Sequence, residues 1–141
     1  MATTRTANAH WEGGLQDGKG NVSLDSSGVG SFDVSWPSRA ESPDGRTSPE
    51  ELIAAAHASC FAMALSNVLG KQGNAPEALD TRADVDFQPG KGITGIKLSV
   101  RGRVPGIDAQ AFQAAAADAK DNCPVSQALK GTPITLDASL A

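Results

Sequence analysis

The chain has 141 residues and a formal net charge of -4 at pH 7, which argues against a nucleic-acid or anionic-membrane partner because both require a basic surface. Its length predicts a single domain spanning residues 1–141, or one compact unit that completes its core with a partner chain. The amino terminus, MATTRTANAHWEGG, lacks the apolar segment of a signal peptide, so we expect a cytoplasmic protein. In a reducing compartment, two cysteines suggest transient redox chemistry or metal binding rather than a static cross-link.

The soft metal ligands of the chain are few and scattered. The histidines and cysteines are His10, His57, Cys60 and Cys123, with no Cys-x-x-Cys pair and no close pair of histidines. Structural zinc sites are usually built from such closely spaced pairs. The sequence therefore does not favour a metal site of this kind, although a carboxylate-rich site stays open.

Residues 8–36 predict β-structure, because NVSLDSSG and GSFDVSW alternate apolar and polar positions between glycines. Residues 37–49, PSRAESPDGRTSP, predict a polar loop, and loops of this length often carry function in small domains.

The next segment predicts a long helix of about 21 residues. Ser48 suits the N-cap, Pro49 the first helical position and Glu51 the third position of a capping box, while Gly70 suits the end. Its apolar residues cover every face, so the helix should be wrapped on all sides or span a membrane. Spanning is disfavoured by four polar interruptions, which are His57, Ser59, Ser66 and Asn67.

The rest of the chain continues the alternation of elements. Residues 79–87 and 93–104 predict two strands joined across QPGKG, and residues 107–121 predict a helix capped by Asp108. NCPVSQALKG predicts a short helix that begins at Asn122 or Cys123 and ends at Gly131, and TPITLDASL predicts a final strand. The fold class is therefore α+β, with strands flanking a long buried central helix.

The two cysteines differ in their predicted surroundings. Cys123 stands where a helix begins, and amide dipoles there favour a thiolate, although a cysteine tolerated near a cap is an equal alternative. Cys60 lies about three turns into the long helix, where apolar surroundings should raise its pKa. Cys60 is thus either a core residue or a nucleophile that needs a cation from elsewhere in the protein.

Charged residues near the long helix are the candidates for activating a thiol. His57 shares a helical face with Cys60, but without an orienting third group we favour a packing or interface role for it. Arg39 in the polar loop could bind a carboxylate through two hydrogen bonds, and Arg46 in the same loop is the alternative candidate for this role. The Glu51 carboxylate should hydrogen-bond at the helix start as part of the capping box, so Glu50 is the glutamate available to orient an arginine.

Several blocks of the chain resemble the osmotically inducible protein C (OsmC) group of the OsmC and organic hydroperoxide resistance superfamily of thiol peroxidases. They are AHWEGG, GKGNVSL, SPEELIAAAHASCFAMALS, VPGID, NCPVSQAL and ITLDASL, and together they cover nearly the whole chain. The blocks around the two cysteines are the most specific, and AHWEG favours the OsmC branch.

The resemblance implies an intertwined α+β homodimer with two active sites at the subunit interface. It implies a peroxidatic cysteine at Cys60, a resolving cysteine at Cys123, and a catalytic glutamate and arginine that match Glu50 and Arg39. Similar members carry an aromatic residue directly after the arginine, where this chain has Ala40.

The implied reaction reduces organic hydroperoxides, and hydrogen peroxide, in defence against oxidative and osmotic stress. Cys60 would form a sulfenic acid and then a disulfide with Cys123, which an external dithiol, such as that of a lipoyl-bearing protein, would reduce. No metal, haem or flavin is required. A non-enzymatic redox sensor or binding module that uses the same cysteines is the alternative.

Overall fold

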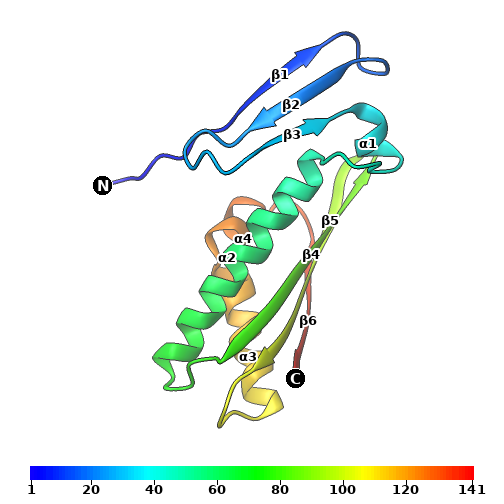
Figure 1. Ribbon diagram of the computed structural model, residues 1–141. Helices are drawn as coiled ribbons and strands as arrows, with labels where there is room; N and C mark the ends of the chain where they lie inside the picture. The colour runs from blue at the N-terminus through cyan, green and yellow to red at the C-terminus, as the bar shows by residue number, and fades with distance from the viewer. The chain divides into compact units, whose positions relative to one another are not determined.

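The computed structural model describes residues 1–141 and separates into two compact units. The amino-terminal unit comprises residues 1–52 and the carboxy-terminal unit residues 53–141, and each is described by itself. Both contain a three-stranded sheet and helical segments (Figure 1), so the α+β class predicted from the sequence is confirmed.

The amino-terminal unit is built on an antiparallel sheet in the order β1-β2-β3. The strands are β1 (Asn8–Glu12), β2 (Lys19–Ser23) and β3 (Ser31–Val34). Asn8 pairs with Ser23 and Gly20 with Val34, so β2 lies between the other two strands. The predicted β-structure of residues 8–36 is confirmed as far as Val34, but Trp36 already lies in the helix that follows.

A short helix, α1 (Trp36–Ala40), replaces the first part of the predicted loop. Ser35 is its N-cap, and Ser38 completes a capping box with it. The Ser38 hydroxyl also lies 3.4 Å from the Thr47 carbonyl oxygen, which ties the helix to the far end of the loop. The prediction of an unbroken loop over residues 37–49 was wrong, because a single doubly capped turn leaves almost no periodic signal.

Helix α2 (Pro49–Lys71) runs from the first unit into the second and is two residues longer than expected. The Ser48 hydroxyl accepts a hydrogen bond from the Glu51 amide at 3.1 Å, as predicted for an N-cap. In the predicted capping box the Glu51 carboxylate would accept from the Ser48 amide, but it accepts from the Thr47 hydroxyl at 2.5 Å. Gly70 lies inside the last turn, and the chain reverses at Gly73, whose φ is 81°.

The carboxy-terminal unit holds the second sheet, in the order β4-β5-β6. Its elements are β4 (Ala78–Gln88), β5 (Gly92–Arg103), α3 (Ala109–Asn122), α4 (Pro124–Ala128) and β6 (Ile134–Leu140). β4 and β5 are antiparallel, whereas β6 returns parallel to β5 after the two helices. Asp108 caps α3 as predicted, but α4 ends at Ala128, before Gly131.

One face of β5 carries the core of this unit. Leu98 and Val100 alternate toward the helices, and Val104 follows directly after the strand; all three are at most 7% exposed. Against them pack the α2 residues Phe61, Leu65 and Leu69, and the α3 residues Phe112, Ala115, Ala116 and Ala119. Both helices therefore cover the same face of the sheet.

Within the carboxy-terminal unit, helix α2 buries only one row of side chains, which differs from the expectation of burial on all sides. The row is His57, Phe61, Leu65 and Leu69, each 0% exposed and spaced by four residues. Met63, on another face of the helix, is 72% exposed. By length and composition alone α2 could cross a membrane, but its buried row is part of the core described above.

We predict that Gly102→Ala destabilises the protein by about 1–3 kcal/mol through overpacking. A Cβ atom at position 102 would lie 2.6 Å from Phe112 Cζ. Urea unfolding measures the effect, and Phe112→Leu in the same chain should lessen it below the sum of the single changes. Gly95→Ala in the same strand is the control, because its nearest atom would be 3.9 Å away. Equal losses for the two glycine variants would contradict the prediction.

Candidate functional site

The two free thiols of the chain lie together in the carboxy-terminal unit. Cys60 Sγ on α2 is 2.9 Å from Cys123 Sγ, although 63 residues separate them in sequence. A disulfide is about 2.05 Å long, so the sulfur atoms need to approach by only about 0.9 Å to form one. Cys60 is partly exposed, whereas Cys123 is 0% exposed. Cys60 is thus the thiol that a small molecule can reach.

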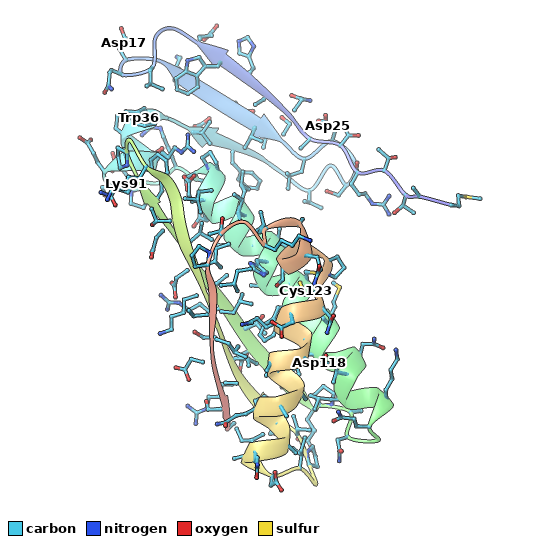
Figure 2. The ribbon with its side chains drawn as sticks, turned by 180° about the vertical axis from the view of Figure 1, so that it is seen from behind. Asp17, Asp25, Trp36, Lys91, Asp118 and Cys123 are labelled. Atoms are coloured by element: carbon cyan, nitrogen blue, oxygen red, sulfur yellow. The ribbon has the colours of Figure 1, made fainter.

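Local structure explains why Cys123 faces α2. Its amide donates to the Ala119 carbonyl at the end of α3, and the same residue is the N-cap of α4 (Figure 2). Pro124 follows at the first helical position, where its missing N–H costs no hydrogen bond. The sharp junction between the two helices directs the thiol into the unit. The predicted start of a helix at this cysteine is confirmed.

Burial raises the pKa of the Cys60 thiol, as the sequence predicted for an apolar helix. The hydrogen bond and charge of the neighbouring Cys123 also raise this pKa, and only the Val125 backbone amide lowers it. No cation contributes to the balance. Because the thiolate is the reactive form of cysteine, the thiol needs a positive charge that this environment does not supply.

His57 does not form the cysteine–histidine pair that its spacing from Cys60 allowed. Its Nε2 atom lies 2.7 Å from the Ser126 hydroxyl on α4, and both residues are buried. Its Nδ1 atom is buried without a hydrogen-bond partner. Burial lowers the pKa of the ring, which favours the neutral imidazole. His57 is therefore a buried packing residue that also makes a polar contact with Ser126.

Arg39 and Glu50 form a bidentate ion pair within the amino-terminal unit. Arg39 Nη2 donates to Glu50 Oε2 at 2.9 Å, and Arg39 Nε donates to Oε1 at 3.0 Å. Glu50 is only 6% exposed. This two-point contact fixes both the position and the plane of the guanidinium. Arg46, the competing arginine, is exposed and makes no ion pair with Glu50.

Trp36 lies beneath the same guanidinium. The Arg39 Cζ atom is 5.9 Å from the centre of the indole ring, within the range of a cation–π contact. The aromatic partner therefore precedes the arginine by three residues instead of following it at Ala40. The capped turn of α1 makes this geometry possible, because residues three apart on a helix are neighbours.

The predicted site residues fall into two pairs, each inside one unit. Cys60 and Cys123 are brought together in the carboxy-terminal unit, and Arg39 and Glu50 in the amino-terminal unit. Sequence analysis missed Trp36 and Ser126. A faint signal existed for Ser126, since it follows Cys123 by three residues just as His57 precedes Cys60 by three.

Comparison with known proteins identifies the family. Residues 42–137 match the model of the OsmC-like protein family. The chain is 46% identical over 143 aligned residues to peroxiredoxin OsmC of Escherichia coli, covering 99% of both chains.

Solved structures agree with this match. The structure of an organic hydroperoxide resistance protein OsmC from Legionella pneumophila has 26% identity and a TM-score of 0.70, covering 100% of this chain and 98% of the other. An OsmC-like protein from Mycoplasma pneumoniae, at 13% identity, shares the fold with a TM-score of 0.75 over 100% and 99% of the two chains. The chain belongs to the OsmC-like protein family.

We predict a coupling energy of about 1–2 kcal/mol between Arg39 and Glu50, because charge-assisted bonds to a buried carboxylate are stronger than exposed ones. The measurement is a double-mutant cycle of urea unfolding with Arg39→Gln and Glu50→Gln at fixed protein concentration. The control cycle uses Arg82→Gln and Asp84→Asn, an ion pair of similar geometry whose side chains are 73% and 40% exposed. The prediction fails if the control pair is coupled as strongly.

Proposed function

We propose that the chain is a thiol-dependent peroxidase that reduces organic hydroperoxides, and hydrogen peroxide, in defence against oxidative and osmotic stress. The observation that carries the proposal is the contact between a partly exposed thiol, Cys60, and a fully buried one, Cys123, at 2.9 Å. The 46% identity to peroxiredoxin OsmC of Escherichia coli supports the reaction class.

The proposed reaction has two chemical steps and a reset. The Cys60 thiolate attacks one peroxide oxygen, the O–O bond breaks, and the products are Cys60 sulfenic acid and an alcohol or water. The Cys123 thiol then condenses with the sulfenic acid, which forms the Cys60–Cys123 disulfide and releases water. An external dithiol, such as that of a lipoyl-bearing protein, reduces the disulfide by exchange. The two sulfur atoms carry the whole redox change, so the scheme needs no metal, haem or flavin.

The proposal assigns activation of Cys60 to Arg39. Burial raises the pKa of this thiol, and a guanidinium near the sulfur would oppose that shift and polarise the breaking O–O bond. Glu50 would hold the guanidinium in place through the bidentate ion pair. The exposed Arg46 lacks such an orienting partner, which favours Arg39 for this role.

We further propose that the active protein is an intertwined homodimer. Glu50 and Cys60 are ten residues apart on the continuous helix α2, or about 15 Å along its axis. Two copies of α2 crossing antiparallel near Ala55 would bring Glu50 of one chain toward Cys60 of the other. Because Arg39 is bonded to Glu50, the same chain would supply both residues to its partner's thiols.

The remaining assignments are also proposals. The two units would act together as one peroxidase domain, with the helix that joins them at the dimer interface. The protein would work in the cytoplasm without a nucleic-acid or membrane partner, since its charge is -4. The alternative is a redox sensor that is oxidised once and stops. Partial exposure of Cys60 allows substrate to reach it, and the identity to peroxiredoxin OsmC of Escherichia coli favours the enzyme.

We predict that one equivalent of organic hydroperoxide converts the reduced protein into the Cys60–Cys123 disulfide, and that excess dithiol sustains turnover. Cys60→Ser should abolish peroxide consumption, because no nucleophile remains. Cys123→Ser should allow one rapid reaction that stops at the sulfenic acid, which dimedone traps for mass spectrometry. Turnover by the Cys60→Ser protein would overturn the mechanism, and a single oxidation without turnover in the wild type would favour the sensor.

We predict that a mixed dimer of a Cys60→Ser chain with a Glu50→Ala chain recovers about half of the wild-type activity per dimer. One of its two sites would then combine an intact Cys60 with an intact Glu50 from the other chain. An Arg39→Gln chain in place of the Glu50→Ala chain should give the same recovery. If each chain builds its own site, both sites stay defective and neither mixture recovers.

A further inference from the structure

The hydrogen bond between His57 and Ser126 lies about one helical turn away from the two thiols, both along α2 and along the start of α4. His57 precedes Cys60 by three residues on α2, and Ser126 follows Cys123 by three at the start of α4. The contacts are 2.7 Å between Nε2 and Oγ and 2.9 Å between the sulfur atoms. The two helical segments are therefore joined by two adjacent polar contacts in antiparallel register.

Helix α4 has little means of holding its own position. It spans five residues, its N-cap Cys123 makes no side-chain capping bond, and helices this short are not stable alone. Its placement against α2 must come from tertiary contacts. The His57–Ser126 bond is directional and buried, with His57 0% and Ser126 4% exposed. It therefore resists sliding or rotation of α4 in a way that apolar packing does not.

An imidazole at position 57 is unfavourable for packing alone. It stands in the same four-residue row as Phe61, Leu65 and Leu69, where an aliphatic side chain would fill a similar space. The buried Nδ1 atom finds no hydrogen-bond partner, which costs stability. What the ring provides and an aliphatic side chain cannot is the bond from Nε2 to α4.

We propose that His57 and Ser126 form a positioning pair for the resolving step, holding α4 in the register that presents Cys123 Sγ to Cys60 Sγ. This inference rests on the proposed function of Cys123. Neither residue exchanges a proton or an electron in it. Cys60 sulfenic acid and the Cys123 thiol still give the disulfide and water, and the pair acts mainly on how often the two sulfur atoms meet.

The test separates the two chemical steps in the full-length reduced protein by stopped-flow mixing with tert-butyl hydroperoxide. Oxidation of Cys60 depends on the peroxide concentration, whereas disulfide formation does not, and dimedone trapping reports the lifetime of the sulfenic acid. Ser126→Ala should leave the first rate within about twofold of wild type and slow the second on the order of tenfold, the effect of one lost hydrogen bond. Ser126→Thr, which keeps the hydroxyl, should restore the second rate.

Two further comparisons keep the test decisive. Ser59→Ala on α2 is the matched control, because this exposed hydroxyl bonds only to the Ala56 carbonyl of its own helix, and both rates should stay unchanged. If Ser126→Ala fails to fold, His57→Gln, which places an amide near the Nε2 position, is compared with His57→Leu. The glutamine should resolve faster than the leucine.

Three results would overturn the inference: an unchanged second rate in Ser126→Ala, equal second rates in the glutamine and leucine variants, or a parallel fall of both rates. Absence of any disulfide in the wild type would instead refute the proposed function of Cys123. The two failures are therefore distinguishable.

Discussion

Desolvation of the Cys60 thiol is the constraint on which the proposed chemistry depends. Apolar surroundings suit the organic tail of a hydroperoxide, but burial raises the pKa of the thiol and so suppresses the thiolate that must attack. The single Val125 amide is the only neighbouring group that lowers this pKa. Reactivity therefore requires a permanent cation, and an arginine that keeps its charge at any working pH meets that requirement.

The surface of helix α2 supports the proposal of a dimer. Its sequence is apolar on every face, yet beyond Leu52 a single chain fully buries only the row from His57 to Leu69 and leaves Met63 72% exposed. An apolar helix face left open to water is unfavourable in proportion to its area. A second copy of α2 would cover it, and the proposed antiparallel crossing would also bring a partner's Arg39–Glu50 pair near Cys60. In the proposed dimer, hydrophobic burial and thiol activation share one interface.

Local sequence signals were sufficient to predict most helices and strands. Contacts between residues far apart in the sequence could not be predicted in this way. The caps Ser48 and Asp108 lie beside the helices they begin, so sequence was sufficient to place both. The five-residue helix α1 was missed, and with it the position of Trp36 under Arg39. The contact of His57 with Ser126 spans 69 residues and depends on how α4 packs on α2, which no local pattern encodes. The family resemblance paired the cysteines, whereas their spacing alone left both roles open.

Unequal exposure of the two sulfur atoms gives the proposed cycle a direction. Cys123 is fully buried, so peroxide meets Cys60 first, and Cys123 reacts only with a sulfenic acid already formed beside it. The same argument applies to the reset, because an external dithiol can reach the disulfide only through the Cys60 sulfur. Attack there expels Cys123 as the leaving thiolate and forms a mixed disulfide on Cys60. Cys60 is then the entry point for both oxidant and reductant, and burial of Cys123 keeps its thiol from reacting with either one alone.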